Sequence, residues 1–180
     1  MPVWLSVTVL VALAAAGLAG MLVGWRHRGA RTAAQVPAPP VVPAPDALGA
    51  ARTEPLEGTY VSSTRAGDWL DRVTAHGLGT RSSATVQVHD AGVLLRRRGA
   101  PDVFLPRAAL RAVGTSGGMA GKVVGKEGLV VLTWAPSPQD DRGLDTGLRL
   151  RHPHDAETLR SAAQDLIRTT PAPAGEEETR

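Results

Sequence analysis

A glycine-rich stretch at residues 114–122 has the residue types of a phosphate-binding loop. It reads Gly-Thr-Ser-Gly-Gly-Met-Ala-Gly-Lys, and glycines allow backbone N–H groups to converge on a phosphate while a lysine completes the site. The spacing departs from the Walker pattern, because Ser116 stands where the first glycine is required and Val123, not serine or threonine, follows Lys122. We therefore interpret this stretch as a flexible connection between strands.

The histidines, acidic residues and serines form no recognisable catalytic or metal-binding motif. The five histidines include no HExxH pair, and Pro153 interrupts the close pair His152 and His154. The aspartates at positions 140, 141 and 145 lack the spacing of a calcium loop, so we interpret them as part of a solvated hairpin loop. No GxSxG motif marks a nucleophilic serine. We expect no catalytic residue, metal site or cofactor, and we predict that the protein is not an enzyme.

The densest basic run is Arg96-Arg97-Arg98, near the end of an apolar segment. Basic residues close to a membrane can engage anionic headgroups, at about 1 kcal/mol each. Successive residues of a strand point to opposite faces, so at most Arg96 and Arg98 would share a side. These two residues are candidates for contact with anionic lipid, and the alternative is a solvated strand end.

Trp69 and Trp134 are the two tryptophans outside the N-terminal apolar segment. The chain contains only one Phe and one Tyr, so its core must be largely aliphatic and large aromatic side chains are needed there. We predict that both tryptophans are buried. The alternative is that they anchor a binding surface.

The elements that would position these residues are mostly strands. Between residues 57 and 169 the apolar segments are short, rich in β-branched residues and separated by glycine. In residues 147–151 leucines alternate with arginines, so the leucines would face a core and the arginines solvent. We expect turns at 90–92, 99–102 and 136–141. The predicted strands are residues 59–64, 84–89, 93–97, 103–105, 110–114, 129–134 and 147–151.

The sequence changes to a helical period at residues 155–168. One apolar stripe is formed there by Leu159, Ala162, Ala163, Leu166 and Ile167. A single helical turn is also expected at residues 68–73. About seven antiparallel strands and a C-terminal amphipathic helix predict a mainly β (α+β) fold, a PH-like barrel with the helix at its open end.

Short motifs at six places in this region support the same fold. They are residues 58–62, 67–73, 76–79, 120–124, 132–134 and 145–147. In this order they resemble the bacterial PH-like domain of small actinobacterial membrane proteins, a largely uncharacterised family with a single N-terminal transmembrane helix. The resemblance covers roughly residues 57–169 and the arrangement of anchor and linker. It implies the fold and the anchor, and it carries over no catalytic residue.

The N-terminal segment predicts a transmembrane helix. No charged residue occurs from position 3 to position 25, a run long enough for the roughly 20 apolar residues that a bilayer requires. Trp4 and Trp25 would lie roughly 32 Å apart along a helix, one at each membrane interface. A cleaved signal peptide is the alternative, but no basic residue precedes the run and the run is longer than a signal peptide requires.

Arg26, Arg28 and Arg31 follow the apolar run directly. Positive residues favour the cytoplasmic side, so we expect a single-pass protein of the cell membrane with its N-terminus outside and its C-terminal domain in the cytoplasm. Within the helix Ala16, Gly20 and Gly24 form a small-residue stripe that would allow close helix–helix contact and a homodimer. Chance composition is the alternative.

The predicted organisation is therefore an anchor at 1–28, a Pro/Ala-rich linker at 29–56, a PH-like domain at 57–169 and a disordered tail at 170–180. Proline-rich composition favours an extended spacer in the linker. Although the pI is about 10.1, 20 Lys and Arg are nearly matched by 17 Asp and Glu, so we expect no nucleic-acid partner.

The leading hypothesis is a membrane-anchored interaction module. Its cytoplasmic domain would bind an unknown protein or a lipid, with the lipid bilayer itself as the other partner. One alternative is an accessory subunit of a membrane transport system, which a single helix could serve only by packing against other membrane proteins. The other alternative is an enzyme, for which the sequence offers no catalytic motif.

Overall fold

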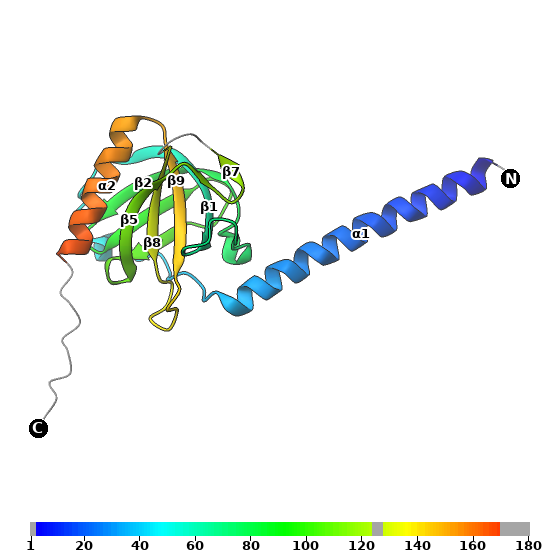
Figure 1. Ribbon diagram of the computed structural model, residues 1–180, viewed down its shortest axis with the longest axis horizontal. Coiled ribbons are helices and arrows are strands. Elements are labelled where there is room, and N and C mark those ends of the chain that lie inside the picture. Colours follow the sequence, from blue (N-terminus) through cyan, green and yellow to red (C-terminus); the bar gives the residue numbers. More distant parts are fainter. Residues whose placement is uncertain (1–2, 124–127, 170–180) are drawn as a thin grey trace, which may run out of the picture.

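The computed structural model describes residues 3–123 and 128–169 of the 180-residue chain. A long helix, α1 (Val3–Gln35), projects from a curved β-sheet domain, and a short 3-10 helix, η1 (Pro45–Leu48), lies between them in the chain (Figure 1). The main strands are β1 (Leu56–Arg65), β2 (Ser82–His89), β3 (Gly92–Arg97), β4 (Val103–Pro106), β5 (Leu110–Ser116), β8 (Leu129–Trp134) and β9 (Leu144–Leu150).

These seven strands form one antiparallel sheet in the order β4-β3-β2-β1-β9-β8-β5. Strand β1 is the longest, and it pairs with β2 on one side and with β9 on the other. Its register against β9 shifts between Tyr60 and Ser62, and such a bulge bends a strand and increases its twist. The bend lets one continuous sheet curl around a core. A hairpin of β6 (Gly118–Met119) and β7 (Lys122–Val123) follows β5.

The C-terminal helix α2 (Pro153–Arg168) packs against β5, β2, β8, β9 and β1 and so covers the core on one side of the curved sheet (Figure 1). Its predicted stripe faces inward: Leu159, Ala163 and Leu166 are buried, and Ala162 and Ile167 pack at the margin of the core. The prediction of seven strands and a closing helix is confirmed, with strand ends differing by at most three residues.

A chain of hydrogen-bonded polar groups runs through the core. Trp134 Nε1 donates to Thr146 Oγ1 at 2.9 Å, and Thr146 Oγ1 lies 2.7 Å from Ser63 Oγ. Ser63 Oγ is in turn 2.7 Å from the Tyr60 hydroxyl, which donates to the Leu78 carbonyl at 2.8 Å. Every hydroxyl in this chain can therefore donate one hydrogen bond and accept one. Satisfied in this way, the buried groups stabilise one arrangement of β1, β8 and β9.

Two predictions for residues 68–73 are wrong. Trp134 is fully buried as expected, but Trp69 is 51% exposed. Residues 68–73 form turns and an isolated bridge between Thr64 and Arg72 rather than a helical turn. Asp68 explains the difference, because its Oδ1 accepts hydrogen bonds from the N–H groups of Leu70 and Asp71 and so closes a tight turn. This turn holds Trp69 at the surface.

Residues 36–56, expected as an extended spacer, lie in part against the domain. Val36 and Leu48 are buried, and Thr53 Oγ1 accepts a hydrogen bond from the Val88 N–H of β2. Helix α1 itself continues to Gln35, well beyond the predicted anchor. The proline-rich segment is thus held by contacts at several points along its length.

Helix α1 exposes large apolar side chains along its described part, including Val7, Leu10, Leu13, Leu18 and Met21. Over the residues that the structure describes, no helix reaches the combination of length and hydropathy needed to cross a membrane. The predicted disordered tail at 170–180 lies outside the described residues.

Candidate functional site

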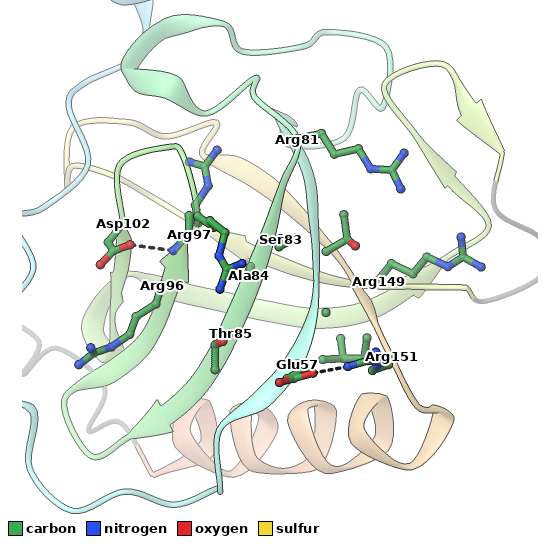
Figure 2. A pocket seen from close by; sticks show the side chains of 14 residues that line it. Glu57, Arg81, Ser83, Ala84, Thr85, Arg96, Arg97, Asp102, Arg149 and Arg151 are labelled. Carbon is green, nitrogen blue, oxygen red and sulfur yellow. Dashed lines mark hydrogen bonds and ion pairs between the residues drawn. The ribbon is translucent and has the colours of Figure 1, made fainter.

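An arginine-lined groove of about 880 Å³ lies on the outer face of strands β3, β2, β1 and β9. Its exposed arginines are Arg81, Arg96, Arg98, Arg149 and Arg151. Figure 2 shows Arg96 on one side of the groove and Arg149 and Arg151 on the other, with Ser83 and Thr85 on the strand between them. We call this surface the arginine groove.

The pairing of the strands explains why these side chains share a face. Arg98, Ser83, Thr59 and Arg149 are neighbours across four strands, and they form one row. A second row, two residues further along each strand, contains Arg96, Thr85, Glu57 and Arg151. Residues two apart on a strand point to the same side, so both rows face outward. Arginines therefore stand at the ends of each row, with two hydroxyl groups between them in the first row and the Thr85 hydroxyl and the Glu57 carboxylate in the second.

Gly58, between Glu57 and Thr59, lies on the floor of the groove. A Cβ atom at this position would lie 2.6 Å from the Arg149 carbonyl oxygen, closer than real Cβ contacts allow. Glycine is thus required for the close approach of β1 and β9, and this approach brings Arg149 and Arg151 to the groove.

Arg97 holds the strand end that carries Arg96 and Arg98. Its side chain turns inward, leaving the residue 6% exposed, and its Nη2 donates to the carbonyls of Gly77 and Thr80 at 2.9 and 2.6 Å. Its Nε donates to Ser82 Oγ at 3.1 Å. With Arg97 fixed on the inner side, the alternation of β3 directs Arg96 and Arg98 outward.

The buried charge of Arg97 alters the groups around it. Burial lowers the pKa of the Arg97 guanidinium, and the nearby Tyr60 and Asp102 act in the opposite direction. Burial likewise raises the pKa of Tyr60 to about 12, although the hydrogen bond with Ser63 and the charge of Arg97 oppose this rise. The raised pKa keeps Tyr60 un-ionised at neutral pH, and an arginine guanidinium stays protonated in proteins.

The arginine groove carries an excess of positive charge. Among the described residues, Arg81, Arg96, Arg98 and Arg149 form no ion pair. Arg151 is bound by Glu57, with Nη1 and Oε2 2.5 Å apart. Like charges gathered on one small surface create a positive potential that attracts anions.

The segment that was predicted to be a linker covers the neighbouring half of the same sheet face. Leu48 packs on Leu94 of β3 and Phe104 of β4, both of which are buried. Further along the segment, the Thr53 carbonyl accepts a hydrogen bond from Gln87 Nε2 at 3.1 Å. The outer face is therefore divided into a covered apolar half and an open basic half, and the arginine groove is the open half.

Asp140 differs most from its predicted environment. It was expected in a solvated loop, but it is buried and its two carboxylate oxygens accept hydrogen bonds from Arg65 at 2.7 and 2.8 Å. The bond from Arg65 is the main reason that the pKa of Asp140 is lowered. Arg111 adds a bond to the Asp140 carbonyl. The pair joins the β8–β9 loop to the end of β1, and the interpretation of Asp140 as solvated is wrong.

The other residues singled out in the sequence do not join the groove. Trp4, Ala16, Gly20 and Gly24 are exposed along α1, and the side chains of Trp25, Arg26, Arg28 and Arg31 lie outside the described part. The glycine-rich stretch forms the end of β5 and the β6–β7 hairpin. Within the described residues, no three His, Asp or Glu side chains are grouped to hold a metal ion.

Arg81, Arg149 and Arg151 were missed as groove residues. The alternation in residues 147–151 did place the arginines on one side of a strand, but it carried no information about which strands are neighbours. The register that aligns Arg149 with Thr59, and Thr59 with Ser83, joins residues far apart in sequence. The sequence therefore showed which side of its own strand each arginine occupies, but it did not show which strands are neighbours.

The geometry defines a small, curved antiparallel sheet closed by a C-terminal helix, with a basic groove on its outer face. The family model described as Bacterial PH domain-like matches residues 36–164. The chain belongs to this bacterial PH domain-like family, and the match includes the segment from Val36 that packs against the sheet.

No curated protein matches the sequence. Seven chains of solved structures match it, and one of them is Vav1 inhibited by an allosteric inhibitor. That chain is 11% identical to this one with a TM-score of 0.40, and the similarity covers 71% of this chain and 29% of the Vav1 chain. This chain therefore corresponds to less than a third of that Vav1 chain.

Proposed function

We propose that this chain is a non-enzymatic interaction module whose PH-like domain binds a protein or lipid partner and whose helix α1 holds it at a membrane. The observation that carries the binding part is the arginine groove, in which four exposed arginines of the described region have no ion-pair partner. Like charges gathered in this way repel one another and do not stabilise the fold, whereas they favour association with an anionic partner.

The binding surface can be tested by photo-crosslinking in cells. A photoreactive amino acid at Thr85, on the floor of the groove, should give crosslinks that mass spectrometry can identify. The same amino acid at Glu157, exposed on α2, serves as the control. We expect a discrete crosslinked species from position 85 and none in common with position 157. Identical crosslinks from both positions, or none from position 85, would overturn the proposal for this surface.

Support for the membrane part comes from the uncharged sequence of residues 3–25 and from the exposed apolar side chains of α1. Replacing Leu10 and Leu13 together by arginine should release the chain from membranes in carbonate extraction, because each buried charge costs about 2.5–3.5 kcal/mol. Val41→Arg, at a residue that is 90% exposed outside the helix, should leave the distribution unchanged. Wild-type chain in the soluble fraction would refute anchoring.

The orientation is a separate part of the proposal. Arg26, Arg28 and Arg31 support a cytoplasmic domain. A reporter enzyme that is active only after export, fused to the C-terminus, should therefore remain inactive. Activity of that fusion would reverse the topology.

An accessory role in a membrane transport system is the second candidate. Gly20 and Gly24 have open space where a Cβ would lie, so a second helix could approach α1 closely. Replacing both glycines by leucine should then abolish co-purification with another membrane protein or with a second copy. Unchanged co-purification would remove this candidate.

A further inference from the structure

The hydrogen-bond donors of the arginine groove surround an open floor. Thr59, Ser83 and Thr85 contribute hydroxyl groups between the two ends of the groove, and among the described residues these hydroxyls have no hydrogen-bond partner. Guanidinium groups flank them on both sides. The ligand that satisfies such a surface must accept many hydrogen bonds and carry negative charge at more than one point.

The spacing of the donors indicates how far apart those charges lie. Neighbouring strands are about 4.8 Å apart, so Arg96 on β3 and Arg151 beyond β9 are separated by three strand spacings, roughly 14 Å at the backbone. Figure 2 shows the Arg96 and Arg149 side chains directed away from Ser83 and Thr85, so they do not close the gap across the groove. A single small anion cannot reach both sides at once, whereas two or more linked anionic groups can.

The character of the lining favours phosphate over an acidic protein segment. Protein-binding hot spots are enriched in aromatic residues and are well packed, but none of the large hydrophobic side chains exposed in the described structure lines this groove. All its basic residues are arginines, whose planar forks bind phosphate or carboxylate oxygens in pairs, so the discrimination rests on the missing aromatic anchors and on the hydroxyl donors. Hydroxyl groups of Ser and Thr add further donors to the same oxygens.

We infer that the arginine groove binds a ligand carrying two or more phosphate groups, one held by Arg96 and Arg98 and another by Arg149, with Arg81 nearby. The inference rests on the proposed binding function of the domain and names the chemistry of its ligand. The phosphates can belong to a soluble molecule or to a lipid headgroup, since the same donors serve both.

Glu57 provides a direct test of the phosphate assignment. Its carboxylate lies within the groove, holds Arg151 at 2.5 Å and repels an incoming phosphate. Glu57→Gln should therefore tighten phosphate binding and free Arg151 for the ligand. Glu54→Gln removes the same charge at an exposed position that does not line the groove, and it serves as the matched control.

The test uses the full chain in zwitterionic detergent micelles and isothermal titration calorimetry with pyrophosphate and orthophosphate. We expect pyrophosphate to bind more tightly than orthophosphate. The double variant Arg98→Gln, Arg149→Gln should bind pyrophosphate about tenfold or more weakly than the wild type. Arg160→Gln with Arg168→Gln, on the exposed side of α2, should leave binding unchanged. Glu57→Gln should strengthen binding more than Glu54→Gln. Matching circular dichroism spectra and melting temperatures confirm that the groove variant is folded.

The source of the phosphates is distinguished by doping the micelles with lipid. Cardiolipin, which carries two phosphates, should compete with pyrophosphate if the natural ligand is a headgroup, while phosphatidylglycerol at equal phosphate should compete less. No competition by either lipid supports a soluble ligand. Equal loss of binding in the groove and α2 variants would overturn the inference.

Binding of an acidic peptide without binding of pyrophosphate would overturn the phosphate assignment and leave the proposed interaction module standing. If pyrophosphate does not bind but position 85 still gives specific crosslinks, the phosphate assignment is likewise wrong and the interaction module still stands. Loss of both pyrophosphate binding and crosslinks would refute the two proposals together.

Discussion

The guanidinium of Arg97 lies 3.9 Å from the centroid of the Tyr60 ring, inside the curve of the sheet. The ring face offers negative charge to the cation, and three carbonyls, of Gly77, Thr80 and Pro101, accept its N–H groups. A cation is thus accommodated in the interior by an aromatic ring and backbone dipoles, with no carboxylate bound to its guanidinium in the described structure. The same contacts fix the strand end that presents Arg96 and Arg98.

Arg97→Met should reduce stability by about 2–4 kcal/mol, because it keeps an unbranched side chain but leaves buried carbonyl groups without donors. Urea denaturation followed by circular dichroism measures the change. Arg96→Met, one residue away and exposed, should remain within about 0.5 kcal/mol of the wild type. Equal effects of the two substitutions would contradict the structural role assigned to Arg97.

Tyr60 is the single tyrosine of the chain, so its ionisation can be followed directly by ultraviolet absorbance. The folded protein should titrate with a pKa of about 12 and the urea-unfolded chain near 10. Because the folded state binds the phenolic proton more tightly, the resulting stability is complete below pH 10 and is lost as pH rises from 10 to 12. The loss should amount to about 2–3 kcal/mol. Titration of the folded protein near 10 would show that Tyr60 is accessible to solvent.

The fold was predictable because its signals are local. Alternation in residues 84–89 and 147–151, turn residues between segments and the stripe from Leu159 to Ile167 each identify an element without knowledge of its neighbours. Trp69 was predicted to be buried because the chain has few aromatic residues, but this argument holds only on average and not for a particular residue. The local turn made by Asp68 determines its position instead.

The arginine groove depends on non-local relationships. Arg96 and Arg98 were recognisable from one run, but Arg149 joins them only through the pairing of β9 with β1 and of β1 with β2. The burial of Leu48 was equally hidden, because proline-rich composition suggests an extended chain and does not show whether that chain lies on a surface. The proline-rich composition predicted an extended backbone, whereas the packing of Leu48 against Leu94 and Phe104 determines where the segment lies on the sheet.

Asp140→Asn should destabilise the protein at neutral pH and lose its effect in acid. The bond from Arg65 lowers the pKa of Asp140, so the stabilisation is present above the unfolded pKa of about 3.9 and disappears as pH falls through the folded pKa. Removing the charge leaves Arg65 partly buried without its partner, at a cost of about 1–3 kcal/mol. Urea midpoints measured between neutral and acidic pH should converge for wild type and variant. The exposed neighbour Asp141→Asn provides the control, and a constant difference at all pH values would disprove the ionic contribution.

Leu48→Ala should loosen the segment that bounds the arginine groove. Leu48 is 4% exposed and packs on Leu94 and Phe104, so the lost contact and the cavity should cost about 2 kcal/mol, at the low end of the range for core leucines because the cluster is small. Trypsin cleavage after Arg52 should become faster, since that residue is held by Asp90 and by the register of the same segment. Val41→Ala removes an apolar side chain that is 90% exposed and should change neither stability nor cleavage. If residues 36–56 acted only as a spacer, both variants would behave like the wild type; a difference between them would show that the segment is part of the folded domain.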